Sequence, residues 1–210
     1  MAELTHHLSA EQETASIENQ KFAMWLYIAS ETILFSIFIG AYAVFRHSQP
    51  EAVKEVHHAL GLFGTLLVTF NSFLLLASSW AMVMGLREIK RGNRQGMIRW
   101  LWAVAGLGTV FVLLQYVEYS RLAEEGVTLY FEGADSAFAG FGMHFYTPTA
   151  FHGAHVIAGV LWCLLVIWKA RNGAYDGAPG RNHAGVEIFG LYWHFVDVVW
   201  VVLFTLIYLV

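Results

Sequence analysis

Long runs of apolar residues alternate with short polar stretches along the chain. Five of these runs are long enough for a helix to cross the hydrocarbon core of a bilayer, which takes about 20 residues. They cover approximately residues 22–45, 59–86, 98–122, 144–168 and 184–210. Because backbone polar groups in lipid must be satisfied within the protein, helices are favoured over an open sheet. The pattern predicts an all-α integral membrane protein, a bundle of five transmembrane helices over residues 22–210, preceded by a polar N-terminal arm, residues 1–21.

The composition fits this pattern and excludes several other classes of protein. Hydrophobic residues make up 57% of the chain and charged residues 13%, whereas a soluble domain carries about 25% charged residues. The net charge of −4 comes without a basic run, so nothing points to nucleic-acid binding. The single cysteine, Cys163, excludes a disulfide framework and a CxxC motif. Residues 1–21 lack the basic start and short apolar core of a signal peptide, so we expect a mobile arm outside the membrane.

The Lys and Arg residues are divided unequally between the two sides of the predicted bundle. One side carries Lys21, Arg87, Lys90, Arg91, Arg94, Arg99, Lys169, Arg171 and Arg181. The other side carries Arg46, Lys54 and Arg121. Because the side richer in Lys and Arg usually faces the cytoplasm, the N-terminus is predicted to be cytoplasmic and the C-terminus to lie outside, on the periplasmic face.

One carboxylate lies near the middle of the first apolar segment. Glu31 is flanked by Ser30 and Thr32, and an unpaired carboxylate at this depth would be costly. One interpretation is a neutral acid that bonds a neighbouring helix. The other is a group that exchanges protons or contacts lipid. The residue alone does not decide between them.

The last segment carries Glu187, His194 and Asp197, which fall on one side of a helix because seven and ten residues are close to two and three turns. Such groups must face protein rather than lipid. They form either a polar seam that binds another helix or subunit, or a proton relay. Two other segments also carry polar residues, which we expect to make polar contacts between helices. They are Gln115, Glu118 and Tyr119 in the third segment and Asn71 and Ser72 in the second.

The fourth segment holds two histidines, His152 and His155, three residues apart and therefore on one face of a helix. Gly153 and Gly159 would let a neighbouring helix approach closely. The spacing leaves three interpretations open: histidines satisfied by packing, metal or haem ligands, and proton carriers. A metal site would need three or four ligands. Pro148 is expected either to start this helix or to kink it.

Five motifs, in order along the chain, resemble one known family. They are MWLYIASE at 24–31, Asn71 with LLLASS at 74–79, LLQYVEY at 113–119, FHGAHVIAG at 151–159 and YWHFVDVVW at 192–200. Together they resemble subunit III of haem-copper terminal oxidases over residues 22–210. Longer members of that family have seven helices. This chain resembles the short bacterial form with five, which leaves open whether the lipid cleft of the long form persists.

The resemblance implies a subunit without redox centres in a proton-pumping oxidase that reduces oxygen to water. It implies contact with subunit I, with subunit II and a small subunit IV, a place in a respiratory supercomplex, bound phospholipids, and a location in the bacterial cytoplasmic membrane. Haems and copper are expected in the partner subunits, with no catalytic or metal-binding residue in this chain. Lipid contact or support of proton uptake is implied for Glu31, His152 and His155. A polar seam or subunit packing is implied for Glu118, Glu187, Trp193, His194, Asp197 and Trp200.

Other functions stay open at this point. Within the family these are subunit III of a quinol oxidase and a relative associated with nitric oxide reductase. Outside it, a small membrane cytochrome would use His152, His155 and His194. A proton-coupled transporter would use Glu31, Glu187 and Asp197, although no inverted repeat or clearly broken helix supports this.

Overall fold

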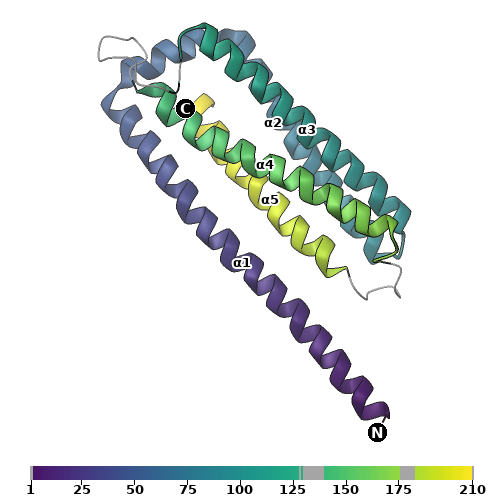
Figure 1. The fold of residues 1–210 in the computed structure, drawn as a ribbon. Helices are drawn as coiled ribbons and strands as arrows, with labels where there is room; N and C mark the ends of the chain where they lie inside the picture. The colour runs from purple at the N-terminus through teal and green to yellow at the C-terminus, as the bar shows by residue number, and fades with distance from the viewer. Residues whose placement is uncertain (1, 128, 130–139, 176–182, 210) are drawn as a thin grey trace.

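The computed structural model describes residues 2–127, 129, 140–175 and 183–209, and the side chains of this part except those of residues 2–13 and 55–60. This described part of the chain forms five long helices (Figure 1). They are α1 (Ala2–Ser48), α2 (Pro50–Lys90), α3 (Arg94–Glu124), α4 (Phe141–Arg171) and α5 (Ala184–Phe204), which continues as a short π-helical turn, η1 (Thr205–Leu209). All five are long and apolar enough to cross a membrane. The predicted all-helical bundle is confirmed for the part of the chain described.

Helices α1 and α2 begin much earlier than the apolar pattern predicts, whereas α3 and α4 begin only three or four residues earlier. Helix α1 begins at Ala2, so the polar arm, residues 1–21, continues the helix from residue 2 onward. The arm contains Ala, Glu, Gln and Leu, which favour helix. Polarity marks where a segment leaves the membrane, not where its helix ends. Helix α2 begins at Pro50 and bends at Gly61, whose positive φ of 58° interrupts the helical backbone, and Figure 1 shows its two parts running in different directions.

Helices α2 and α3 form an antiparallel pair joined by a tight turn at residues 91–93, and α3, α4 and α5 complete a packed unit with α2. Helix α1 packs mainly on α4 and α5, and Figure 1 shows its N-terminal part extending beyond the other helices. The molecule therefore consists of a four-helix core and one more peripheral helix.

The core closes around Trp193 of α5, which is fully buried. Its ring lies between Gly108 of α3 and Gly159 of α4, where an added Cβ would come within 2.8 and 2.6 Å of indole atoms. The indole N–H donates to Ser78 of α2 at 3.0 Å. Helices in a membrane often pack through small residues that leave room for a large ring on the neighbouring helix. Burial of apolar surface gives little driving force for helix association in lipid, so close packing matters more.

Pro148 lies inside α4 and is buried. The helix begins three residues before the predicted boundary, at Phe141, after Gly140 with a φ of 79°. Pro148 therefore does not start the helix. Its ring nitrogen cannot donate to the carbonyl one turn earlier, and the adjacent Thr149 hydroxyl bonds the Phe145 carbonyl at 2.6 Å.

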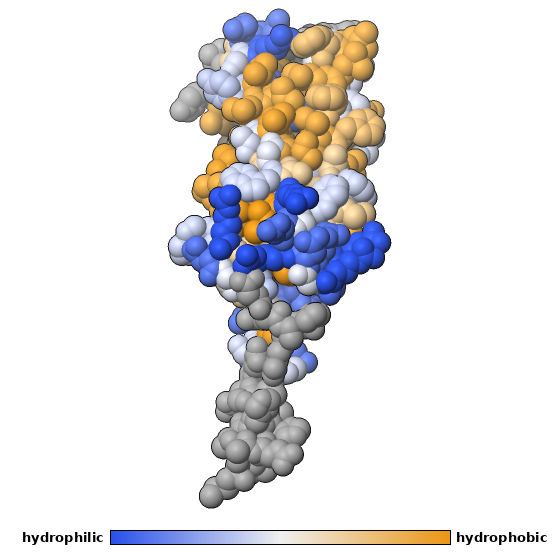
Figure 2. Space-filling model, turned by 90° about the vertical axis from the view of Figure 1, so that its right-hand side faces the viewer, coloured by the Kyte–Doolittle hydropathy of each residue, from blue (hydrophilic) through white to orange (hydrophobic). Residues whose placement is uncertain are grey.

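The outer surface of the helices is apolar. Figure 2 shows hydrophobic atoms above a hydrophilic belt. Large exposed side chains on this surface include Trp25, Phe73, Leu113, Leu161 and Val198. Soluble proteins rarely expose contiguous apolar surface of this extent. The chain is therefore a membrane protein.

Candidate functional site

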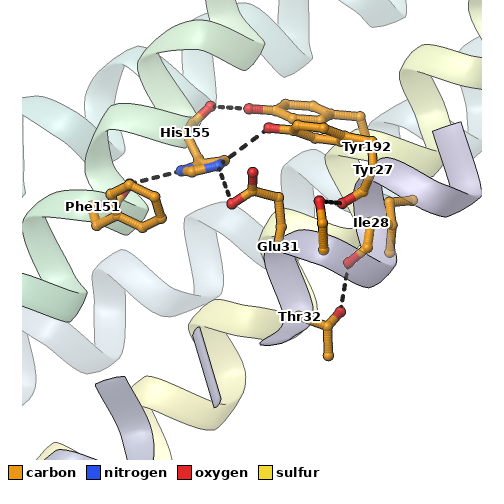
Figure 3. A network of polar contacts seen from close by, with 8 residues as sticks. Tyr27, Ile28, Glu31, Thr32, Phe151, His155 and Tyr192 are labelled. Atoms are coloured by element: carbon orange, nitrogen blue, oxygen red, sulfur yellow. Dashed lines mark hydrogen bonds and ion pairs between the residues drawn. The ribbon is translucent and has the colours of Figure 1, made fainter. Parts of the chain in front are cut away.

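The membrane carboxylate Glu31 of α1 faces His155 of α4 (Figure 3). Glu31 Oε2 lies 3.4 Å from His155 Nε2, and the two side chains are only 13% and 11% exposed. Among the described side chains, Glu31 Oε2 has no hydrogen bond of good geometry. The carboxyl group is thus turned toward a neighbouring helix, and the contact with His155 is close without being a strong hydrogen bond.

The other contacts of His155 show which of its ring nitrogens carries hydrogen. His155 Nδ1 lies 2.9 Å from the Phe151 carbonyl, and because a carbonyl only accepts, Nδ1 must donate. In a neutral ring Nε2 is then an acceptor that faces Glu31, and the Tyr27 hydroxyl lies 3.4 Å from it. Nε2 of His155 is therefore the ring atom that faces both the Glu31 carboxyl group and the Tyr27 hydroxyl.

Aromatic rings surround this pair and fix its geometry. Tyr27 precedes Glu31 by four residues and Phe35 follows it by four, so one face of α1 presents all three to α4 and α5. The ring of Phe35 contacts that of His155 with centroids 5.5 Å apart. Tyr192 of α5 stacks on Tyr27 at 6.2 Å and donates its hydroxyl to the His155 carbonyl at 2.8 Å. Three helices therefore hold the pair in place.

Sequence reasoning singled out neither Tyr27 nor Tyr192 as a site residue. The i, i+4 spacing of Tyr27 and Glu31 was a usable signal. Nothing comparable pointed to Tyr192, because its contact depends on how α5 packs against α4.

His152, the other histidine of α4, lies in a different environment. It is fully buried, stacks on Trp200 of α5 with centroids 4.9 Å apart, and meets the edge of Phe111 of α3. Neither of its ring nitrogens has a hydrogen bond within the described part of the chain. His152 is thus a core residue, whereas His155 on the same helix contacts α1.

The physical reason is the helical turn. Positions three apart differ by about 60° around a helix axis, which is enough to aim His152 at the core and His155 at α1. The two rings therefore do not converge on one ion. Within the described residues no group of three or more His, Cys, Asp or Glu lies close enough to hold a metal.

The polar face of α5 begins with an ion cluster at Glu187. Its carboxylate accepts from Lys21 of α1 at 2.5 Å, from Lys90 of α2 at 3.0 Å and lies 3.0 Å from His183. Its side chain is 16% exposed. Glu187 therefore links α1, α2 and α5 at one end of the bundle, and the sequence alone did not indicate either lysine as its partner.

Further along the same face, His194 and Asp197 are turned toward α2. The ring nitrogen Nδ1 of His194 lies 2.7 Å from the Ser79 hydroxyl. Asp197 is 4% exposed, and neither of its oxygens has a well-formed hydrogen bond among the side chains described. Glu187 and His194 both contact α2, as the shared helical face predicts, so the polar seam joins helices of this chain.

The polar residues of α3 and α2 also join helices, which confirms the interpretation made from their positions. Gln115 donates to the Thr149 carbonyl at 3.0 Å, and Tyr119 donates to the Thr149 hydroxyl at 2.8 Å. Glu118 is buried and accepts from the Tyr208 hydroxyl at 2.5 Å. In α2, the Asn71 amide donates a hydrogen bond to the Phe111 carbonyl of α3, and the Ser72 hydroxyl accepts one from the Trp200 indole of α5.

A mostly apolar groove of about 480 Å³ opens beside Tyr27, between α1, α4 and α5. Its lining includes Trp162 and Lys169 of α4, and Tyr175, which follows the end of that helix. Burial raises the pKa of Tyr175 above its usual range, so its hydroxyl stays neutral at physiological pH. Since Tyr27 belongs to both features, the groove reaches the surroundings of the Glu31–His155 pair.

Comparison with known proteins shows the family of this chain. The model of the family described as cytochrome c oxidase subunit III matches residues 4–210. Cytochrome c oxidase subunit 3 of Synechocystis sp. is 37% identical over 188 residues, covering 90% of this chain and 74% of that protein. The corresponding subunit of Alkalihalophilus pseudofirmus is 32% identical, covering 96% of this chain and 93% of the relative. Cytochrome bo(3) ubiquinol oxidase subunit 3 of Pseudomonas aeruginosa is 30% identical, with 91% and 85% covered. This chain belongs to the cytochrome c oxidase subunit III family.

Proposed function

We propose that this chain is the non-catalytic subunit III of a proton-pumping cytochrome c oxidase in a bacterial cytoplasmic membrane. It packs on subunit I, alongside subunit II and a small subunit IV, and the haems and copper belong to those partners. A place of this complex in a respiratory supercomplex is part of the proposal. The observation that carries the proposal is the close contact between Glu31 and His155, two ionisable groups inside the helix bundle, in a chain of this family.

The role of this pair is to support proton uptake by the complex and to contact lipid. An apolar groove reaches Tyr27 at the edge of the pair, and a lipid chain is the ligand that such a surface accepts from the bilayer. His152, in contrast, has a packing role, since its ring is enclosed by Phe111 and Trp200.

The orientation proposed is the one expected from the Lys and Arg residues. The ends of α2 and α4 and the start of α3 carry most of them, so these ends face the cytoplasm. Arg181, one of the residues that this count uses, lies outside the residues described. The C-terminus then lies on the periplasmic side.

Purification of the complex with and without this chain tests the proposal. We expect the tagged chain to co-purify with a haem-bearing subunit, and the chain alone to show no visible absorbance. Deleting its gene should leave part of the initial rate of oxygen reduction but shorten the number of turnovers before inactivation. A Soret band in the isolated chain, or no effect of the deletion on either quantity, would contradict the proposal.

A quinol oxidase subunit is the second candidate, because relatives named as ubiquinol and quinol oxidase subunits are about 30% identical to this chain. The electron donor is bound by other subunits. Oxygen uptake by the purified complex with reduced cytochrome c, compared with a quinol, separates the two functions. Identification of the co-purifying catalytic subunit also separates an oxygen-reducing complex from one that reduces nitric oxide.

A further inference from the structure

A basic hollow lies between the beginning of α3 and the end of α4, away from the Glu31–His155 pair. Its volume is about 330 Å³, and Arg94, Gln95, Ile98, Arg99 and Arg171 line it. The first four residues come from α3 and the last from α4. We propose that this hollow binds the phosphate headgroup of an anionic phospholipid.

The charge of the hollow favours a phosphate. Three arginines line it, and the lining residues described include no carboxylate, although the chain as a whole has a net charge of −4. Glu88, on the neighbouring turn, is engaged by the side-chain amide of Asn93 at 2.5 Å. Guanidinium groups match the paired oxygens of a phosphate in both geometry and charge. The positive end of the α3 dipole adds to the attraction.

The surface next to the hollow favours a lipid over a free phosphate ion. Trp102 follows Arg99 by three residues on α3, and Trp168 precedes Arg171 by three on α4. Both indoles are exposed, as is Leu165 one turn deeper on α4. Tryptophan is enriched at the level of the lipid headgroups. The arginines thus lie next to exposed apolar side chains at one end of the bundle.

The seam between α3 and α4 continues from the hollow toward the middle of the membrane. The helices are in contact there, since the Cys163 thiol donates to the Leu101 carbonyl at 3.3 Å. Basic pockets between transmembrane helices are a known mode of anionic lipid recognition. The proposal rests on the membrane placement of the chain and on its proposed contact with lipid, and it adds the class of lipid and a second location. It does not depend on the role of Glu31.

Native mass spectrometry of the intact oxidase complex tests the proposal. The complex is delipidated in detergent and titrated with phosphatidylglycerol, with phosphatidylcholine and with inorganic phosphate. The test variant is R99Q/R171Q. The control is R87Q/R91Q, which removes the same charge from exposed arginines at the same end of the bundle but outside the hollow. Arg94 is kept in both because it makes further contacts.

We expect the wild-type and control complexes to bind one phosphatidylglycerol that phosphatidylcholine does not replace. In R99Q/R171Q its affinity should fall about thirty-fold at low salt, from the loss of two arginines near a lipid phosphate. The initial rate of oxygen reduction by the R99Q/R171Q complex should stay unchanged. A loss of lipid binding in this variant can therefore be told apart from a loss of the proposed oxidase function.

Four outcomes would overturn the proposal. Equal weakening in the control would show a diffuse surface charge. Equal binding of phosphatidylcholine would remove the preference for anionic lipid. Displacement of the lipid by inorganic phosphate would show a site for the free ion. Loss of a subunit from R99Q/R171Q, with phosphatidylglycerol binding unchanged, would show that the hollow holds an acidic surface of a partner protein.

Discussion

The surroundings of Trp193 and those of Glu31 differ in how tightly the helices pack around the side chain. Trp193 fills a slot between two glycines, donates to a serine and is fully buried. Glu31 and His155 lie between α1 and the core, slightly exposed, at a distance too long for a strong hydrogen bond. The first region specifies how α2 to α5 pack. The second brings two ionisable side chains together where α1 meets α4, and it is not needed to close the core.

The largest effect is expected from filling the slot of Trp193. In G108A the new Cβ would lie 2.8 Å from the indole and 2.9 Å from Val160. Overpacking of this kind costs about 1–3 kcal/mol, so the melting temperature of the purified complex should fall. Gly106, two residues away on the same helix, has open space around it, and G106A should leave the melting temperature unchanged or slightly raised. Equal effects of the two variants would show that the slot does not specify the packing.

A smaller effect is expected at the ion cluster that links α1 to the core. E187Q removes the charge that Lys21, Lys90 and His183 share. The cluster is partly exposed, so we expect a loss of about 1 kcal/mol at low salt that diminishes as salt is added. The control is E51Q, since Glu51 pairs with Lys54 at 3.0 Å and both side chains are well exposed. Its effect should be close to zero, and a loss in E187Q that is insensitive to salt would contradict the electrostatic explanation.

Apolar periodicity was enough to predict the helices that cross the membrane, because length and hydropathy are properties of single segments. It did not predict that α1 would begin at Ala2, since a polar sequence can continue a helix beyond the bilayer. The apolar pattern did not predict the bend of α2 either. Gly61 permits the positive φ found there, but many glycines in helices have ordinary backbone geometry.

The site was predicted only in part, for a related reason. Glu31 stood out as a carboxylate in an apolar run, but its partner was not evident, because two histidines of α4 were equally placed in the sequence. The packing of α1 selects His155, and that of α5 encloses His152. The lysines that bind Glu187 come from two other helices. Partners far apart in the chain require the tertiary arrangement, which a single sequence does not provide.

The central claim is that the Glu31–His155 pair serves the complex and not the stability of the fold. The most direct test counts the turnovers of the intact oxidase before inactivation, in wild type and in E31Q, with S36A as a control on the same helix. Ser36 is exposed, and its hydroxyl bonds the Thr32 carbonyl of its own helix. We predict that E31Q assembles fully, changes the stability of the complex by less than about 0.5 kcal/mol, and inactivates after fewer turnovers, while S36A behaves as wild type. A fully assembled E31Q oxidase with wild-type endurance would contradict the claim.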